Sequence, residues 1–460
     1  MEFLGRADEI RNLLASYKSD EQRTVLVYGR RRIGKSELIK QSIRKSGIRS
    51  IYYECKQTTE PNNVQSLSAL ISEILGYPKL AFSSIEETLE FLFRTAVKEK
   101  LIVALDEYSY LRDVVKGLDS IIQSLIDKYK DSSNMKLILS GSYVDAMMSL
   151  LANGNPLFGR IDLTINLKPM DYLDSALFYP SFSNDDKVRL FSVFGGIPYY
   201  NRLIDSGKTV KENIIDLIAS PGARLENEVV MYLRSEISKI VNVNEVFEAL
   251  ASGFSKFSDI LSQSNVSSGP TLADVLDKLI RMEVVVREVP INDEGNKKKA
   301  GYFISDNMFL FYYRYVFRYP SQMNVMDPEA FFDRYISDDF ESKYVPKRFE
   351  VICRQYLIRQ NKEGRLAEPF ERIGKYWYEL PSEHRNGEFD VVTEDRKGYA
   401  LYEAKFWKNS VNKDEILNEI KQVSDTGLKP YKIGFFSRSG FGNLDGLDID
   451  AFDLKDIYGE

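Results

Sequence analysis

The fold of this chain is decided by residues 29–36, Gly29-Arg30-Arg31-Arg32-Ile33-Gly34-Lys35-Ser36, which fit the phosphate-loop pattern G-x-x-x-x-G-K-[ST]. The apolar run 24–28 before this loop is typical of a buried strand, and residues 36–43 after it favour a helix. A strand, a glycine turn and a helix start together present backbone N–H groups and the positive end of a helix dipole to a phosphate. The alternative is an ordinary glycine turn before a helix, which does not explain Lys35 and Ser36. The loop therefore predicts a nucleotide pocket.

The chemistry of the loop assigns a task to its last residues. We expect Lys35 to reach the β- and γ-phosphates and the Ser36 hydroxyl to bind Mg²⁺. No Asn-Lys-x-Asp motif for reading guanine follows the later strands in the sequence, which favours ATP and ADP as the nucleotides. The predicted nucleotide-binding residues of this stretch are Gly29, Arg30, Arg31, Arg32, Ile33, Gly34, Lys35, Ser36 and Glu37.

An acidic pair supplies the second half of the predicted site. Residues 101–105 are a near-continuous apolar run, typical of a strand buried on both faces of a parallel sheet, and Asp106 and Glu107 follow them. We expect Asp106 to bind Mg²⁺ and Glu107 to orient or deprotonate the attacking water, the alternative being a solvated acidic turn. Ser142, after the apolar run 136–139, is either a sensor of the γ-phosphate or part of a simple turn.

Strands and helices alternate from residue 24 to residue 167, which predicts a doubly wound parallel α/β sheet with ligands at the carboxyl ends of its strands. Short motifs recur in and around this region: Phe3-x-Gly5-Arg6, Gly29-x4-Gly34-Lys35-Ser36, Leu105-Asp106-Glu107-Tyr108, Leu139-Ser140-Gly141-Ser142, Pro156-Leu157-Phe158-Gly159-Arg160 and Gly195-Gly196-Ile197-Pro198-Tyr199-Tyr200. Together they resemble the archaeal-type ATPases of the STAND and AAA-related P-loop group. The resemblance covers about residues 1–240, with a helical lid at about 170–240.

This resemblance implies further site residues and a type of function. It implies that Phe3, Arg6 and Pro198 flank the adenine. It places Arg160 where an arginine meets the γ-phosphate or a neighbouring copy of the chain, although a structural surface role is equally compatible with the sequence. It also implies slow hydrolysis, as in switch ATPases whose contacts to the γ-phosphate change their domain arrangement.

The middle of the chain, residues 241–320, has the outline of a winged-helix domain. Helical patches are expected at 244–250, 256–262 and 272–280, followed by hairpin strands at 283–289 and 300–304. Lysines at the hairpin tip are candidates for contact with DNA phosphates, but a solvated loop is also naturally charged, and the module can instead serve as a lid. The aromatic-dense stretch 306–315 is expected to be a buried helical connector.

The last part, residues 321–460, carries a second constellation. A helix at 349–357 precedes strands at 373–377, 387–392 and 399–406, and a further helix is expected at 415–423.

Within these strands, Asp390 followed by Glu403-x-Lys405 has the spacing of the PD-(D/E)XK nuclease core. Asp390 and Glu403 are predicted to hold Mg²⁺, with Glu350 as a further ligand, and Lys405 to steady the attacking water or the scissile phosphate. The arrangement also resembles the domain of unknown function that often follows archaeal-type ATPases. The alternatives are a solvated charged face and an α/β restriction-endonuclease-like fold that only binds.

Composition limits the remaining classes of function. The net charge of −6 gives no overall attraction to nucleic acid, so DNA contact requires a local basic patch. No apolar run approaches the roughly 20 residues of a membrane span, and the N-terminus does not resemble a signal peptide, so we expect a cytoplasmic protein without membrane association. Cys55 and Cys353 are expected to be reduced thiols.

Two functions remain open: an ATP-hydrolysing switch whose nucleotide state controls a DNA-cleaving domain, or an ATP-regulated DNA- or protein-binding module with an inactive nuclease fold. A protein partner or a homo-oligomer is compatible with both, since an arginine acting on a neighbour's nucleotide needs a second copy.

Overall fold

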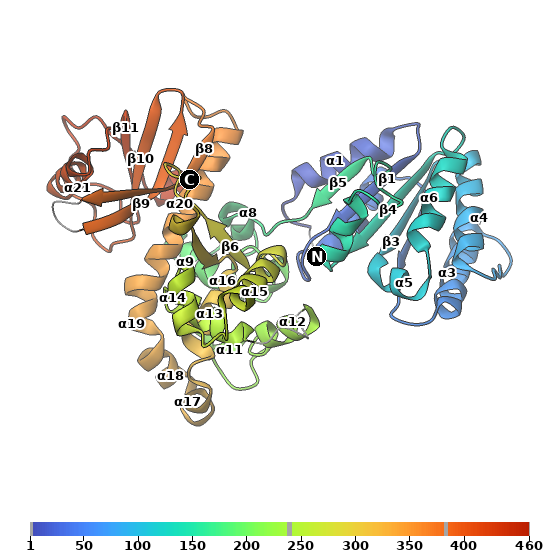
Figure 1. Ribbon diagram of the computed structural model, residues 1–460, viewed down its shortest axis with the longest axis horizontal. Coiled ribbons are helices and arrows are strands. Elements are labelled where there is room, and N and C mark those ends of the chain that lie inside the picture. The colour runs from blue at the N-terminus through green and yellow to red at the C-terminus, as the bar shows by residue number, and fades with distance from the viewer. Residues whose placement is uncertain (1–2, 237–241, 381–384, 460) are drawn as a thin grey trace. The chain divides into compact units, whose positions relative to one another are not determined.

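The computed structural model describes residues 3–236, 242–380 and 385–459 (Figure 1). The chain divides into two units, one built from Met1–Pro169 with Ile197–Tyr199 and the other from Met170–Gly196 with Tyr200–Glu460. Among the described residues, no helix is long and apolar enough to span a membrane. Both cysteines are buried free thiols.

The first unit is built on a five-stranded sheet in the order β2-β3-β4-β1-β5, in which every neighbouring pair is parallel. Its strands are β1 (Arg23–Tyr28), β2 (Ser50–Glu54), β3 (Leu101–Asp106), β4 (Met135–Gly141) and β5 (Leu163–Asn166). Every residue of β3 and β4 is buried, which explains their continuous apolar sequence. The predicted doubly wound parallel fold is confirmed.

Helices cover both faces of this sheet (Figure 1). Alternate residues of β3, Leu101, Val103 and Leu105, belong to one core cluster that also contains apolar residues of α3, α4 and α6, while Ile102 and Ala104 point the other way and are buried as well. The helices are α1 (Ala7–Lys18), α2 (Lys35–Ser46), α3 (Glu60–Leu75), α4 (Ile85–Lys98), α5 (Tyr108–Val114), α6 (Leu118–Tyr129) and α7 (Val144–Met148).

The region expected to be a helical lid is helical in the structure. Its helices are α8 (Tyr172–Ala176), α9 (Asn184–Phe194), α10 (Pro198–Asn201), α11 (Val210–Leu217) and α12 (Glu228–Glu236). A capping box at Thr209 and Glu212 begins α11, because each side chain accepts a hydrogen bond from the other's backbone N–H. The assignment of this region as a lid stays a prediction.

Three helices and an antiparallel hairpin follow, as the sequence predicts. They are α13 (Val243–Ala251), α14 (Phe257–Gln263), α15 (Gly269–Arg281), β6 (Val285–Glu288) and β7 (Gly301–Ile304). The Ser268 side chain caps α15, since its hydroxyl oxygen accepts a hydrogen bond from the Thr271 backbone N–H. That these elements form a winged helix stays a prediction.

The aromatic stretch after the hairpin is a helix that changes its winding. It continues from α16 (Asn307–Phe311) into a π-helical turn, Tyr312–Val316, and most of its aromatic side chains are buried. A second π-helical turn, Phe340–Tyr344, leads into a long helix. The helices of this segment are α17 (Pro320–Val325), α18 (Pro328–Tyr335), α19 (Ser337–Asp339) and α20 (Val345–Lys362).

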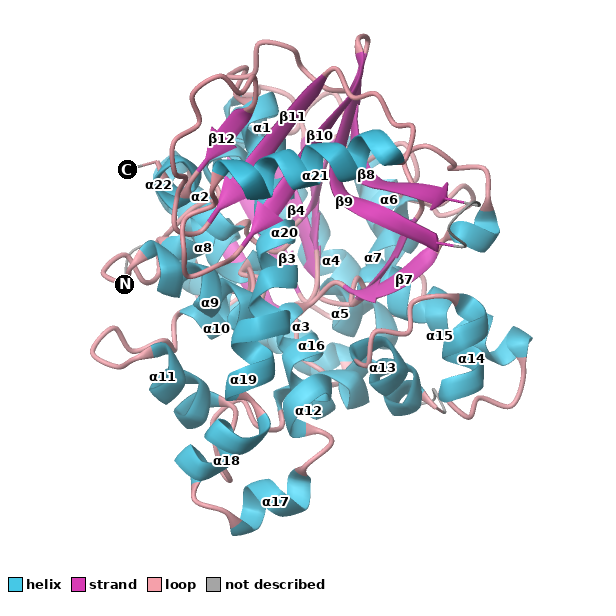
Figure 2. Cartoon of the chain, turned by 90° about the vertical axis from the view of Figure 1, so that its left-hand side faces the viewer, coloured by secondary structure: helices cyan, strands magenta, loops and turns pink. Residues whose placement is uncertain are grey.

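The chain ends in a second, mixed sheet of order β12-β11-β10-β9-β8, with α21 lying across it (Figure 2). Strands β8, β9 and β10 pair antiparallel, whereas β10, β11 and β12 pair parallel. Apolar residues of α21 such as Ile416 and Val423 pack into the clusters beneath this helix. The elements are β8 (Arg372–Leu380), β9 (Arg385–Asp395), β10 (Gly398–Lys405), α21 (Lys413–Asp425), β11 (Lys432–Ser437), β12 (Asp450–Phe452) and α22 (Leu454–Tyr458).

Candidate functional site

The loop between β1 and α2 needs glycine at both of its motif positions. Gly34 precedes α2 with φ +96°, a conformation that residues with a side chain rarely adopt. At Gly29, φ is +152° and a Cβ atom would collide with the backbone carbonyl of Leu167. The loop therefore turns tightly against the chain that follows β5 and leads directly into the start of α2.

Lys35 lies over this loop. Its ammonium group donates hydrogen bonds to the carbonyl oxygens of Gly29 at 2.8 Å and Arg30 at 3.1 Å, and to the Ser142 hydroxyl at 3.0 Å. Because Lys35 is buried and begins a helix, its positive charge adds to the field of the helix N-terminus. The contacts hold the charge where an incoming phosphate would need it.

Ser36 and Asp106 meet although they come from different elements. The Ser36 hydroxyl donates a 2.5 Å hydrogen bond to Asp106 Oδ2, and the Tyr52 hydroxyl donates to the same oxygen. Asp106 Oδ1 accepts from the backbone N–H of Glu107 at 3.1 Å. Burial and the nearby Asp106 carboxylate raise the pKa of Tyr52 above its ordinary range, which keeps this phenol a donor. A hydroxyl and a carboxylate in contact are oxygen ligands of the kind that Mg²⁺ prefers, so these residues fit the predicted metal.

Glu107 is held by Ser142. Glu107 has φ +51° at the start of α5, and its two carboxylate oxygens accept from the Ser142 hydroxyl at 2.5 Å and from the Ser142 backbone N–H at 3.2 Å. The Ser142 hydroxyl also accepts from Lys35, so it joins the lysine of the loop to the acid at the end of β3. The sequence singled out all three residues, and the structure brings them together.

Two of the three residues expected near adenine lie beside the loop. Arg6 is buried and donates to the carbonyl oxygens of Lys168 at 2.6 Å and Ile33 at 3.5 Å. Pro198 lies against Gly34, since its Cγ would be 3.8 Å from a Cβ at that glycine. Phe3 is half-buried in the segment before α1.

The remaining loop residues differ in their surroundings. Ile33 and Arg30 are buried, whereas Glu37 is exposed. Arg31 donates to the hydroxyls of Tyr110 at 3.2 Å and Tyr143 at 3.3 Å, and the Arg32 guanidinium lies 4.3 Å from the ring centre of Tyr199.

Sequence reasoning missed the tyrosines around the loop. Tyr52 is brought to Asp106 by the parallel pairing of β2 with β3, and a single sequence does not specify which strands pair. Tyr110 and Tyr143 each follow a strand end that the sequence did single out, so their positions were a usable signal.

Arg160 makes surface contacts within its own unit. Its guanidinium pairs with both carboxylate oxygens of Asp127, at 2.9 and 2.8 Å, and donates to the Pro156 carbonyl at 3.1 Å. The hydrogen bond to Asp127 raises the pKa of Arg160. In the described contacts Arg160 therefore acts as a structural surface residue, and a role toward the γ-phosphate stays a prediction.

In the C-terminal sheet, lysines surround the acidic residues that the sequence predicted. Asp390, on β9, pairs with Lys347 at 2.9 Å and Lys375 at 3.1 Å, and Lys347 also pairs with Glu350 at 3.1 Å. Although burial opposes ionisation, the two ammonium groups lower the pKa of Asp390. Burial and the Asp390 charge raise the pKa of Glu350 to about 7.

Glu403 and Lys405 lie on one face of β10 and pair at 3.6 Å. Lys405 makes a shorter 2.5 Å contact with Glu419 of α21. Burial raises the pKa of Glu403 to about 7.

These carboxylates were predicted to bind a metal ion. Within the described ranges, no group of three or more His, Cys, Asp or Glu residues is placed to hold one. Asp390 is instead neutralised by two lysines. The assignment of Glu350, Asp390 and Glu403 as Mg²⁺ ligands stays a prediction, and in this structure the ammonium groups of two lysines lie beside the central carboxylate.

One lysine of the hairpin between β6 and β7 makes contacts within the protein. Lys299 pairs with Asp293 at 2.8 Å, and its ammonium group lies 3.5 Å from the ring centre of Trp377 on β8. The Asn292 side-chain amide also donates a hydrogen bond to the Trp377 carbonyl and accepts one from the Trp377 backbone N–H. These contacts attach the hairpin to the second sheet, so Lys299 is engaged within the protein.

Two family models match separate parts of the chain. Residues 3–203 match an ATPase domain found predominantly in Archaea, and residues 312–417 match archaeal and bacterial proteins of unknown function. An uncharacterized protein of Methanocaldococcus jannaschii is 27% identical over 463 residues, which cover 99% of this chain and 100% of that protein. Among solved structures, the Walker-type ATPase PABY2304 of Pyrococcus abyssi is similar over 68% of this chain and 96% of its own, with 21% identity and a TM-score of 0.52. Residues 3–203 are thus similar to an archaeal ATPase domain, and the fold of the N-terminal unit is similar to that of a solved Walker-type ATPase.

Proposed function

We propose that this archaeal-type P-loop ATPase is a switch that binds ATP with Mg²⁺, hydrolyses it slowly, and through its nucleotide state controls a DNA-associated, nuclease-like C-terminal domain. The observation that carries the proposal is the chain of hydrogen bonds from Lys35 through Ser142 to Glu107, at 3.0 and 2.5 Å. It links the residue that would bind the γ-phosphate to the residue that would act on water.

The residues of the site divide the work between binding and hydrolysis. The N–H groups of the loop and Lys35 bind the phosphates, and Ser36 and Asp106 would hold Mg²⁺. When bound, Mg²⁺ neutralises charge that develops on the phosphates. Arg6 and Pro198, which lie beside the loop, would contact the adenine together with Phe3, while the other loop residues would shape the pocket.

Slow hydrolysis follows from the present contacts of Glu107. Its carboxylate accepts two hydrogen bonds from Ser142, which fix its orientation, so turning it toward an attacking water would break at least one of them. A γ-phosphate would compete for the Ser142 hydroxyl and for Lys35. The nucleotide would therefore change the position of Glu107, and with it α5, which gives ATP and ADP different effects on the protein.

For the C-terminal domain, the order α20-β8-β9-β10-α21-β11 and the positions of Asp390, Glu403 and Lys405 support a nuclease-like fold. The second candidate is that this domain binds DNA or a protein without cutting. The pairing of Asp390 with Lys347 and Lys375 favours this second candidate, because the ammonium groups lie beside Asp390 where a catalytic metal ion would have to bind.

The ATPase half of the proposal is tested by ATP binding and turnover in the full chain. We expect Lys35→Ala to lose ATP binding, and Glu107→Gln to keep it while turnover falls by about 10²-fold or more. Turnover that is unchanged in Glu107→Gln would remove Glu107 from the reaction.

The C-terminal half is tested with labelled duplex, single-stranded and branched DNA, with Mg²⁺ or Mn²⁺ and with or without ATP. Cleavage that disappears in Asp390→Ala supports a nucleotide-controlled nuclease. DNA binding without cleavage supports the second candidate. The absence of both binding and cleavage would contradict the DNA association. A mixed-subunit ATPase assay with Arg160→Ala would test whether Arg160 acts on a neighbouring copy.

A further inference from the structure

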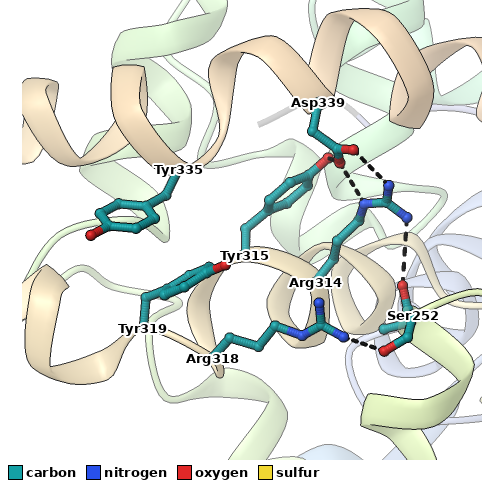
Figure 3. Close-up of a pocket in the computed structure, with 8 residues that line it drawn as sticks. Ser252, Arg314, Tyr315, Arg318, Tyr319, Tyr335 and Asp339 are labelled. Carbon is teal, nitrogen blue, oxygen red and sulfur yellow. Dashed lines mark hydrogen bonds and ion pairs between the residues drawn. The ribbon is translucent and has the colours of Figure 1, made fainter.

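A cavity of about 310 Å³ lies in the helical part of the second unit (Figure 3). Its wall comes from the end of α13, the first π-helical turn with the residues after it, α18 and α19. The lining residues are Ala251, Ser252, Arg314, Tyr315, Arg318, Tyr319, Tyr335 and Asp339. Its volume is at the lower end of the range of about 300–1,000 Å³ that is usual for small-molecule sites.

The first π-helical turn lines this cavity, and the second begins directly after a lining residue. Arg314 and Tyr315 belong to the first turn, and Asp339 directly precedes the second. The turns contact each other through Tyr315 and Tyr344, whose ring centres are 5.5 Å apart. Since π-helical turns are rare and occur frequently at functional sites, their presence on two facing segments points to a constraint other than packing.

Among the side chains that line the cavity, the positive charges outnumber the negative ones. Arg314 makes a two-pronged pair with Asp339, at 2.7 and 2.9 Å, and the Tyr315 hydroxyl donates to the same carboxylate at 2.7 Å. The hydrogen bond from Arg314 lowers the pKa of Asp339, so this carboxyl is ionised. The hydrogen bonds recorded for Arg318 go to neutral oxygens, the Ser252 hydroxyl and the Glu248 carbonyl. Arg318 therefore gives the cavity one positive charge in excess.

The opposite end of the cavity is aromatic. Tyr319 and Tyr335 are half-buried, with ring centres 4.5 Å apart and planes tilted by 34°. Figure 3 shows these two rings at one side of the cavity and the guanidinium groups of Arg314 and Arg318 at the other. An aromatic ring stacks a flat ligand group, and a guanidinium group binds a phosphate through directed N–H bonds.

We propose that this cavity binds a phosphate monoester carried on a flat ring, as in a nucleoside monophosphate. The phosphate would contact Arg318, and the ring would stack against Tyr319 and Tyr335. The source of this chemistry is either a free mononucleotide or the 5′-phosphorylated end of a nucleic acid strand. The inference goes beyond the proposed switch function and does not depend on the phosphate loop.

The test is calorimetric titration of uridine 5′-monophosphate into the full chain carrying Lys35→Ala, which removes the nucleotide site of the first unit. We expect saturable binding that weakens by about tenfold or more in Arg318→Gln and in Tyr319→Leu, as expected for loss of a charged hydrogen bond or a stacked ring. Arg396→Gln is the matched control, since Arg396 is a highly exposed arginine of the same unit. This control should bind like the parent.

Further arms separate the parts of the proposal. Uridine and inorganic phosphate should each bind at least tenfold more weakly than the monophosphate, because each lacks one of the two groups. A 5′-phosphorylated trinucleotide that binds as well as the monophosphate identifies a strand end as the source, and binding of the free mononucleotide alone identifies a metabolite. No binding of the monophosphate, or equal binding in Arg318→Gln, would overturn the proposal.

Discussion

The hydroxyl of Ser142 lies 2.5 Å from a carboxylate oxygen of Glu107 and donates a hydrogen bond to it. The same hydroxyl accepts from Lys35, so one oxygen at the end of β4 connects the lysine of the loop with the acid that follows β3. Parallel strands place both residues at one edge of the sheet. A γ-phosphate at Lys35 would change this connection, and this is how we expect the protein to distinguish ATP from ADP.

Replacement of Ser142 by Ala should therefore reduce the preference for ATP over ADP. In the wild-type protein, the Ser142 hydroxyl would move from Glu107 to the γ-phosphate of bound ATP. The Ala variant lacks this charged hydrogen bond, and its loss corresponds to about tenfold in ATP affinity. ADP affinity should change little, since ADP lacks the γ-phosphate. Competitive displacement of a fluorescent nucleotide measures both affinities, and an unchanged ATP-to-ADP ratio would show that Ser142 is only part of a turn.

Tyr52 should affect the Mg²⁺ requirement of ATP turnover through Asp106 and not through contact with the nucleotide. Its hydroxyl donates to Asp106 Oδ2 and so orients the carboxylate beside Ser36. We expect Tyr52→Phe to raise the Mg²⁺ concentration for half-maximal ATP turnover by about tenfold, the lower end of effects for residues that orient a ligand. Tyr53→Phe is the control, because that hydroxyl bonds Asn63 instead. Equal Mg²⁺ curves for Tyr52→Phe and wild type would contradict this role.

The Gly29→Ala substitution should destabilise the nucleotide domain. The new Cβ would collide with the Leu167 carbonyl at a backbone angle of +152°. A cost of about 2–3 kcal/mol, typical of backbone strain with overpacking, would lower the melting temperature of a domain of this size by roughly 4–12 °C. Gly295→Ala, with open space around its Cα, should melt like wild type in the same calorimetric scan. A Gly29→Ala chain of unchanged melting temperature would show that the loop can shift.

Glu403 should make the C-terminal domain less stable as pH rises. Its pKa is raised by burial from 4.5 to about 7, so the folded state binds the proton more tightly than the unfolded state. The corresponding stability is complete below about pH 4.5 and is lost as pH increases through 7. Glu403→Gln should reduce the loss of stability between pH 5 and 8 by about 2 kcal/mol.

Denaturant unfolding can follow this effect by fluorescence, since both tryptophans of the chain, Trp377 and Trp407, lie in this domain. Glu371→Gln, at an exposed carboxylate, should keep the pH profile of wild type. The Glu403 interpretation fails if Glu403→Gln and wild type lose the same stability over this pH range.

Local sequence determined how much of the site was predictable. Lys35 and Ser36 follow from one continuous stretch of strand, loop and helix, and Asp106 from the end of an apolar run. Tyr52 was not predicted, because its contact with Asp106 depends on which strands pair.

The C-terminal carboxylates show the same limit. The strand that carries Asp390 was predicted from periodicity, but its partners Lys347 and Lys375 lie on α20 and β8, and a motif of three residues does not specify its neighbours. The π-helical turns were missed as well, because a stretch of aromatic residues has the same periodicity signal whether or not one extra residue is inserted in a turn.

The central claim, that the nucleotide state controls the C-terminal domain, is tested most directly by hydrogen exchange of the Glu107→Gln full chain with ATP and with ADP. This variant should keep ATP bound, since its turnover is expected to fall by about 10²-fold or more. The account predicts that amide protection differs between the two nucleotides both around Ser142 and in residues 345–459. A difference confined to the first unit, with identical exchange throughout residues 345–459, would contradict it.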